Sequence, residues 1–191
     1  MKIRTVLLAL LTLSAVCVPV FAEDLRLDGR IFGGGTLYDY SGESFGAKAS
    51  PAAGISLGAM FPTGGALFFG IELGGTYNFR SNYNDYYYYD SSFALSLTPQ
   101  LGVDLPGRSP HWFLTAGAGV SHTFSGLFSK TYLLATAGAG VYFSRFIVDG
   151  MQLSYVHGFV KDYSLFESLR VSVIVHLLRG GAKGRKEGGD P

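Results

Sequence analysis

Seven charged residues are the first candidates for chemistry, because they interrupt segments that are otherwise apolar or small. They are Arg26, Asp28, Arg30, Glu72, Arg80, Asp104 and Arg170. In each segment the charge occupies the less apolar of two alternating faces. Charges held away from water are costly unless they are paired, so we expect these residues to form one network. Arg30 and Glu72 lie near the middle of their segments and should be its centre.

Histidine and tyrosine provide the other candidates. The four histidines are His111, His122, His157 and His176, and their spacing matches no metal-ligand pattern. We therefore predict neither a metal site nor a bound cofactor. A run of tyrosines lies between residues 81 and 91, namely Tyr83, Tyr86, Tyr87, Tyr88 and Tyr89. Tyrosine offers rigid contact area at low entropic cost, so the run predicts an external recognition surface; the alternative is that these rings belong to an aromatic girdle.

The segments that carry these residues have the period of β-strands. Between His111 and Val120 apolar side chains alternate with small or polar ones, and the sequence Thr-Ala-Gly-Ala-Gly-Val occurs at both 115–120 and 136–141. Such alternation predicts strands with two unlike faces. Pro99, on the apolar face of one segment, predicts a bulge there. The pattern predicts eight strands, which cover approximately residues 24–38, 51–61, 66–80, 92–105, 111–124, 132–145, 150–160 and 167–178.

The composition suits a chain with its apolar side chains outside. Charged residues make up 15% of the chain, against roughly 25% in soluble domains, and no lysine falls within a predicted strand. The polar face consists mainly of Gly, Ser and Thr, which suit a narrow lumen better than a surface in water. Aromatic residues gather toward the strand ends, as in interfacial girdles. The net charge of +1 and the lack of a basic stripe argue against nucleic acid as a partner.

The connections between the predicted strands give a second indication. Their lengths are about 12, 4, 11, 5, 7, 4 and 6 residues, alternately long and short. Membrane barrels have short turns at one end and longer loops at the other. If the chain starts on the inner side, every long connection, including the tyrosine-rich one, emerges outside the cell.

The first 22 residues have the pattern of a secretory signal peptide. Lys2 and Arg4 precede an apolar stretch that ends at a small-residue site, and we place cleavage after Ala22. A retained anchor helix and a lipoprotein acylated at Cys17 are the alternatives. Cleavage would remove that cysteine, the single one in the chain. The predicted organisation is a signal peptide at 1–22, a barrel at 23–178 and a disordered tail, rich in Gly, Lys and Arg, at 179–191.

Together, the signal peptide, the eight alternating segments and the two Thr-Ala-Gly-Ala-Gly-Val sequences resemble the small eight-stranded bacterial outer-membrane β-barrel proteins. The resemblance covers residues 24–178 as a pattern rather than as a specific motif. It implies an all-β chain, an eight-stranded antiparallel up-and-down transmembrane barrel in the outer membrane. It also implies contact with outer-membrane lipid, assembly by the barrel-assembly machinery, and external loops that meet host or extracellular ligands. The chain departs from the family pattern at Leu177 and Leu178, where its last strand ends without a terminal aromatic residue.

Some barrels of this kind are lipases or acyltransferases that act on lipopolysaccharide, with a histidine and a nearby serine at the outer rim. His157 and Glu167 could lie close across a hairpin there. The residue two positions after His157 is Phe159, however, and the residue two positions after His122 is Phe124. The expected serine is missing in both places. We therefore predict that the chain is not an enzyme and that these are rim histidines at the level of the lipid headgroups.

The function of the lumen has two interpretations. An eight-stranded barrel has an interior just wide enough for side chains to fill, so the charged network predicts a structural plug; a gated pore or proton path is the alternative. We therefore expect a structural or surface-interaction, adhesin-like barrel with a plugged lumen. A small-solute channel is the second possibility, and a soluble periplasmic lipocalin-like binding barrel is the third.

Overall fold

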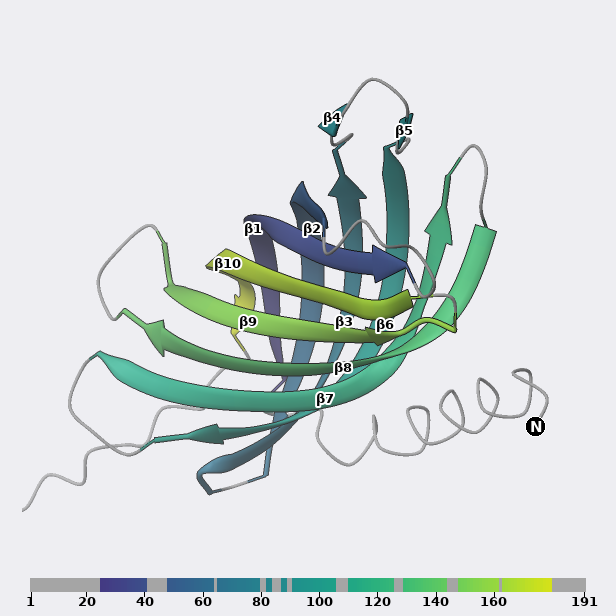
Figure 1. The fold of residues 1–191 in the computed structure, drawn as a ribbon. Coiled ribbons are helices and arrows are strands. Elements are labelled where there is room, and N and C mark those ends of the chain that lie inside the picture. The colour runs from purple at the N-terminus through teal and green to yellow at the C-terminus, as the bar shows by residue number, and fades with distance from the viewer. Residues whose placement is uncertain are drawn as a thin grey trace, which may run out of the picture.

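The chain folds into a closed barrel of eight antiparallel strands (Figure 1). The computed structural model describes residues 25–40, 48–63, 65–79, 82–83, 87–88, 91–105, 110–125, 129–143, 148–161 and 163–179. The order around the barrel is β1-β10-β9-β8-β7-β6-β3-β2, so that each strand pairs with its neighbours along the chain and β1 closes against β10. The predicted all-β fold with eight antiparallel strands is confirmed.

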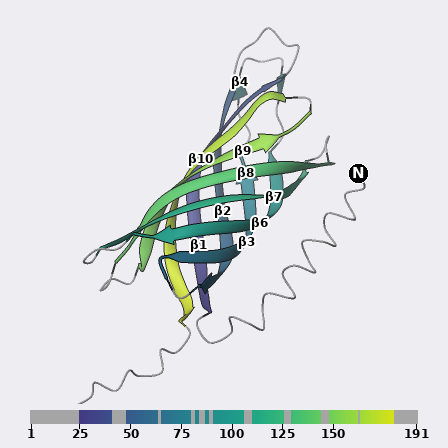
Figure 2. The same ribbon diagram turned by 90° about the horizontal axis from the view of Figure 1, so that it is seen from below.

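Each barrel strand has the 9–11 or so residues that a tilted strand needs to cross a bilayer. Two shorter strands, β4 (Asn82–Tyr83) and β5 (Tyr87–Tyr88), pair as a hairpin between β3 and β6. This hairpin stands beyond the ends of β3 and β6, at the top of Figure 1, and Figure 2 shows the tilt of the strands from below. The barrel strands are β1 (Arg26–Tyr40), β2 (Lys48–Pro62), β3 (Leu67–Asn78), β6 (Ser92–Asp104), β7 (His111–Phe124), β8 (Ser129–Tyr142), β9 (Gly150–Phe159) and β10 (Tyr163–Arg179).

A helix with the length and apolar character needed to cross a bilayer does not occur in the part of the chain that the structure describes.

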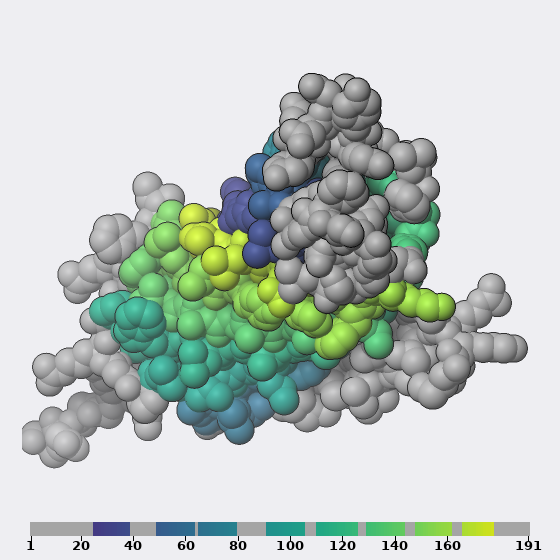
Figure 3. Space-filling model, in the orientation of Figure 1, coloured from purple at the N-terminus to yellow at the C-terminus, as the bar shows by residue number. Residues whose placement is uncertain are grey.

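Side chains alternate between the outside and the lumen, because successive residues of a strand point to opposite faces. On β1, Ile31 is 65% exposed whereas the next residue, Phe32, is 5% exposed. Figure 3 shows the side chains of β7 to β10 as a continuous surface. An apolar outside and a polar inside are what a bilayer requires of a spanning barrel. Other exposed apolar side chains include Ile55, Leu57, Leu73, Leu101, Leu114, Leu133 and Leu153, and buried polar ones include Thr36, Ser56, Thr98, Gln100, Ser121 and Gln152.

Glycines on the inward face make room for aromatic rings from the neighbouring strand. Phe68 on β3 is paired with Gly102 on β6, and Phe113 on β7 is paired with Gly140 on β8. A Cβ atom added to Gly102 would lie 2.0 Å from the Phe68 ring, and one added to Gly140 would lie 2.3 Å from the Phe113 ring. Each ring therefore covers a glycine, an arrangement that also helps to hold strand register.

The bulge predicted at Pro99 is absent. Pro99 pairs with Ile71 on β3 in continuous register. On the β7 side, the pairs Leu97–Val120 and Gln100–Gly117 keep one register on either side of it. Proline removes only its own N–H from the ladder, so pairing is interrupted without a shift. A bulge occurs in β10 instead, where Leu27 pairs with Leu178 but Asp28 pairs with His176.

The predicted alternation of connection lengths is only partly correct. The connections between the barrel strands contain 7, 4, 13, 6, 4, 7 and 3 residues, so the alternation fails over the last three. β8 begins at Ser129 and β10 at Tyr163, both several residues earlier than predicted. These extensions shorten two connections that were expected to be long.

The two terminal segments of the chain, the predicted signal peptide at 1–22 and the predicted tail from 180 onward, lie outside the described residues. β10 ends at Arg179, one residue beyond the predicted limit of the barrel. The cleavage after Ala22 and the disorder of the tail therefore stay predictions.

Candidate functional site in the barrel lumen

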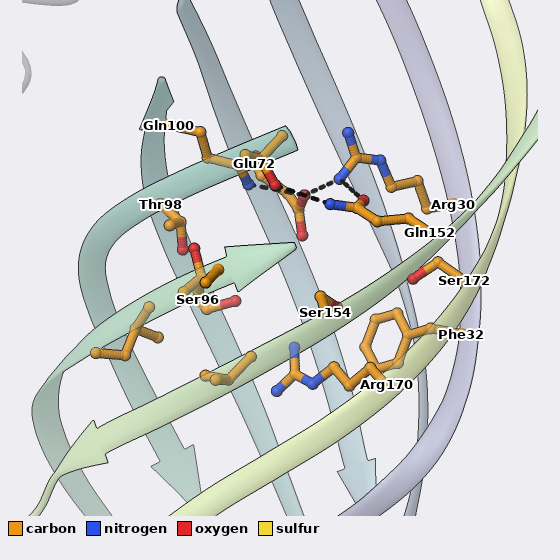
Figure 4. Close-up of a pocket in the computed structure, with 15 residues that line it drawn as sticks. Arg30, Phe32, Glu72, Ser96, Thr98, Gln100, Gln152, Ser154, Arg170 and Ser172 are labelled. Carbon is orange, nitrogen blue, oxygen red and sulfur yellow. Dashed lines mark hydrogen bonds and ion pairs between the residues drawn. The ribbon is translucent and has the colours of Figure 1, made fainter. Parts of the chain in front are cut away.

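An ion pair between Arg30 on β1 and Glu72 on β3 lies in the lumen. Arg30 Nη1 donates to Glu72 Oε2 at 2.5 Å and to Gln152 Oε1 at 2.9 Å. Gln100 Nε2 donates to the same Glu72 oxygen at 2.9 Å. These side chains come from β1, β3, β6 and β9, and Figure 4 shows the bonds that link them. The Arg30 side chain is 4% exposed, so its charge depends on Glu72 for compensation.

The other charges of the predicted network make separate contacts. Arg26 Nη2 lies 3.4 Å from Asp104 Oδ2, in a bridge that is partly exposed. Asp28 is buried and receives a hydrogen bond of 3.5 Å from the hydroxyl of Tyr142. Arg80 lies outside the described residues. The structure thus brings Arg30 together with Glu72 and Arg26 together with Asp104, but it does not join the two pairs.

His176 is a lumen residue that sequence reasoning did not assign to a site. Its Nδ1 lies 3.7 Å from Asp28 Oδ1 and 3.4 Å from Asp149 Oδ2. Its backbone N–H donates to Asp149 Oδ2 at 2.6 Å, and the Asp149 N–H donates to the carbonyl of Ile174 at 2.9 Å. Asp149, just before β9, therefore links the chain to the end of β10, next to the bulge in that strand. The contact depends on that bulge, for which the sequence carries no signal.

Arg170, on β10, lies apart from both ion pairs. Its guanidinium carbon is 4.8 Å from the centroid of the Phe32 ring, a cation–π contact. Its Nε donates to Ser168 Oγ at 3.3 Å. Within the described part of the chain, Arg170 forms no ion pair with a carboxylate.

An apolar cluster fills another part of the lumen. Phe113 and Tyr142 stack with their ring centroids 4.4 Å apart, and Tyr142 also reaches Asp28, so the cluster borders the Asp28–His176 contact. Sequence reasoning missed Met60, Phe68 and Ile174 as lumen residues. The sequence pattern could have placed Ile174 in the lumen, because Ile174 lies on the same face of its strand as Arg170. The cluster comprises Met60, Phe68, Phe113, Tyr142 and Ile174.

A small cavity remains beside the Arg30–Glu72 pair. Its volume is about 30 Å³, enough for about two water molecules. Arg30, Glu72 and Arg170 are its charged lining residues. Figure 4 shows Arg170 with Phe32 on one side of the labelled group and the Arg30–Glu72 pair on another. The polar uncharged lining residues include Ser96, Thr98, Gln100, Gln152, Ser154 and Ser172.

Two polar clusters lie on the outer face of the barrel. His122 on β7 has its Nε2 2.9 Å from Ser129 Oγ and its Nδ1 2.7 Å from Thr131 Oγ1. Ser129 belongs to β8, so a search for serine two positions after the histidine missed it. His157 Nδ1 lies 3.7 Å from Glu167 Oε1, as the expected hairpin predicts. Groups of three or more His, Cys, Asp or Glu residues able to hold a metal ion do not occur among the described residues.

The tyrosine-rich segment is described only in its short strands. Tyr83 pairs with Tyr87, and Asn82 pairs with Tyr88. Tyr86 and Tyr89 lie outside the described residues. The backbone of this segment therefore forms a hairpin, whereas the roles of its rings remain predictions.

Comparisons with known proteins identify the fold. No family model matches the sequence, and no curated protein does. Among solved structures, the chain is similar to Neisserial surface protein A, with 13% identity, a TM-score of 0.54, and coverage of 79% of this chain and 96% of the other. It is also similar to the outer-membrane enzyme PagL, with 18% identity, a TM-score of 0.56, and coverage of 78% and 98%. The chain has the fold of the small eight-stranded outer-membrane barrels.

As an outer-membrane barrel, the chain presents the belt of exposed Leu, Ile and Val side chains to lipid. Its predicted location in the outer membrane and its contact with lipid therefore follow from the fold and the apolar surface together. Its neighbours include both a surface protein and an enzyme. The fold supports a membrane barrel, but it does not by itself decide which role the barrel has or whether it is catalytic.

Proposed function

We propose that this outer-membrane barrel has a closed lumen and acts through its external surface, as an adhesin-like interaction protein. The observation that carries the proposal is the filling of the lumen. Phe68, Phe113 and Ile174 are each 2% exposed or less, and they project into the space that a pore would need. An eight-stranded barrel leaves little room beyond its own side chains.

The remaining lumen space supports a plug rather than a channel. The cavity beside Arg30 and Glu72 has a volume of about 30 Å³, which is too small for an organic solute. Opening a path would require breaking the Arg30–Glu72 pair, and a broken buried pair costs about 3–5 kcal/mol. A small-solute channel is therefore the less favoured function.

The surface role rests on the segment between β3 and β6. This connection of 13 residues is the longest between two barrel strands and carries the run of tyrosines. Its β4–β5 hairpin stands clear of the barrel in Figure 1. Tyrosine rings combine apolar area with a hydroxyl, which favours contact surfaces. We propose that the binding partner is a host or extracellular molecule contacted by this segment, and that the barrel-assembly machinery inserts the chain.

Conductance across a planar lipid bilayer tests the closed lumen. The purified protein, refolded and inserted, should show no steady ion current above that of protein-free bilayers. A large-pore porin inserted under the same conditions serves as the positive control. Stable, ohmic steps from the wild-type protein would contradict the proposal and would favour the channel.

We further propose that the barrel binds rather than catalyses. Ser129 and His122 are within hydrogen-bond distance, but the second nitrogen of His122 contacts the Thr131 hydroxyl instead of a carboxylate. A nucleophilic serine normally needs a base that is oriented and stabilised by a third, acidic group. A fluorophosphonate probe should therefore leave Ser129 unmodified, as judged by intact mass. Stoichiometric labelling that Ser129→Ala abolishes would show that the outer face carries a hydrolase.

A further inference from the structure

We propose that the lumen cavity beside Arg170 binds one small monovalent anion, of about the size of chloride. The proposal rests on the closed lumen proposed above but not on the surface role. Three charged side chains line the cavity, namely Arg30, Glu72 and Arg170. Glu72 is engaged by Arg30 and Gln100 through a single oxygen. The lining therefore holds two guanidinium groups and one carboxylate, a formal excess of one positive charge.

Glu72 lines the same cavity and acts on Arg170 at longer range, but among the described residues Arg170 forms no ion pair with a carboxylate. Its Nε donates to the Ser168 hydroxyl, and its guanidinium carbon lies 4.8 Å from the centroid of the Phe32 ring. In Figure 4 no dashed line joins Arg170 to another lining residue. A guanidinium has five N–H donors, and within the described part of the chain its two terminal nitrogens have no hydrogen-bond acceptor. These contacts leave the guanidinium without a directly bonded counter-charge among the described residues.

The rest of the lining favours an anion over a cation. Thr98 and Ser154 present hydroxyl groups to the same cavity, and a hydroxyl can donate a hydrogen bond to an anion. The hydroxyl of Ser96 donates to the Gly74 carbonyl instead. Ser154 is the cross-strand partner of Arg170, so one hydroxyl lies on the strand beside the guanidinium.

The size of the cavity sets the class of ligand. A volume of about 30 Å³ accepts about two water molecules, and a halide ion is comparable with one of them. Phosphate, carboxylic acids and lipid headgroups are larger. Water alone would satisfy the N–H donors, but it would not neutralise the charge, and an unpaired charge in a space with little water is costly. The geometry therefore points to a halide, with water as the competing occupant.

The effect of chloride on the unfolding of the protein tests the anion site in solution. The wild-type protein in detergent micelles is unfolded in urea, and its single tryptophan, Trp112, reports the transition. Sodium chloride is compared with sodium gluconate at equal ionic strength, because gluconate is too large for the cavity. A ligand that binds only the folded state raises its population by a factor of 1 + [L]/Kd. Above Kd, each tenfold rise in chloride should therefore raise the folded-to-unfolded ratio about tenfold.

Two variants make the test specific. Arg170→Gln removes the excess charge, so its unfolding midpoint should be the same in chloride and gluconate. Arg26→Gln removes a cation that pairs with Asp104 and does not line the cavity, so it should keep the chloride dependence. Equal midpoints for the wild type in the two salts would overturn the proposal. A chloride dependence that persists in Arg170→Gln would also overturn it.

A second measurement needs no variant and so does not depend on Arg170→Gln folding. Crystals of the wild-type protein grown in sodium bromide should show an anomalous difference peak beside the Arg170 guanidinium. Electron density for water alone at that place would overturn the proposal. Neither measurement involves conductance or binding to cells. A negative result here would leave the surface role standing, and a failure of the surface role would leave the anion site standing.

Discussion

Glu72 supplies the carboxylate that pairs with Arg30, and the Arg30 side chain is almost fully buried in the lumen. Glu72→Ala leaves the Arg30 guanidinium without its carboxylate, and removing one partner of a buried pair costs about 3–5 kcal/mol. We expect the variant to unfold at a clearly lower urea concentration than the wild type. Trp112 fluorescence in micelles measures the change.

The matched control for this variant is Asp104→Ala. Asp104 also pairs with an arginine, but its side chain and that of Arg26 are partly exposed. An exposed pair contributes about 0–1 kcal/mol, so this variant should unfold close to the wild type. Equal losses in the two variants would show that the burial of Arg30 is not what makes the lumen pair important.

Gly102 lies directly against the Phe68 ring, so a larger residue at this position should disturb packing. Gly102→Ala places a methyl group within 2.0 Å of the Phe68 ring, and Phe68 is packed among buried side chains. Overpacking of this kind costs about 1–3 kcal/mol, and the urea midpoint should fall accordingly. Gly33→Ala is the control, because a Cβ there has nothing within 4 Å. A larger loss in Gly33→Ala would contradict this explanation.

Residue faces could be predicted from the sequence, whereas most residue partners could not. Strand parity correctly places Arg30, Glu72 and Arg170 in the lumen. Which of them meet depends on the stagger between strands, which the sequence leaves open. Arg30 on β1 meets Glu72 on β3, past the intervening strand β2, and the Asp28–His176 contact depends on a bulge. Ser129 reaches His122 from a neighbouring strand, so spacing along one strand does not reveal it.

The β4–β5 hairpin between β3 and β6 allows the proposed contact surface to be tested. In an extended segment alternate side chains point to opposite faces. Only about half of the tyrosines can therefore meet one partner. We expect Tyr86→Ser with Tyr88→Ser and Tyr87→Ser with Tyr89→Ser to weaken binding to cells or extracellular matrix to different degrees. Protein reconstituted in nanodiscs and assayed on immobilised matrix measures the difference.

Two results would contradict the recognition role of the hairpin. If both double variants bind and insert like the wild type, the segment is not the contact surface. If both instead lower the stability of the barrel, the tyrosine rings belong to the aromatic girdle. The urea unfolding assay used for Glu72→Ala distinguishes loss of binding from loss of stability.

The strands themselves were predictable in number and facing, but less so at their ends. The eight alternating segments correspond to the eight barrel strands. Strand ends depend on how far a hairpin continues beyond the membrane, where no apolar face is required and the alternation fades. β8 and β10 extend in this way, which explains why the predicted alternation of loop lengths fails in the second half of the chain.

For the molecule as a whole, a closed barrel predicts resistance to detergent. Every strand of the barrel is hydrogen-bonded to a neighbour on both sides, so the barrel has no edge from which strands could separate one at a time. Samples kept unboiled in dodecyl sulfate should therefore migrate differently from boiled samples on a gel. The protein should also remain with the membrane fraction in alkaline carbonate. Release by carbonate or by high salt would contradict the integral placement in the membrane.

The rings that cover glycines on adjacent strands have a consequence for how such a sequence can diverge. Phe113 and Gly140 occupy one volume between them, so neither position can change size alone without loss. Substitutions at the two positions should therefore occur in pairs. A smaller side chain at position 113 should accompany a larger one at position 140, or the ring and the glycine should exchange strands. In an alignment of natural variants, positions 113 and 140 should therefore change together. Positions 68 and 102 should do the same. Phe113→Gly combined with Gly140→Phe should accordingly retain more stability than either change made alone.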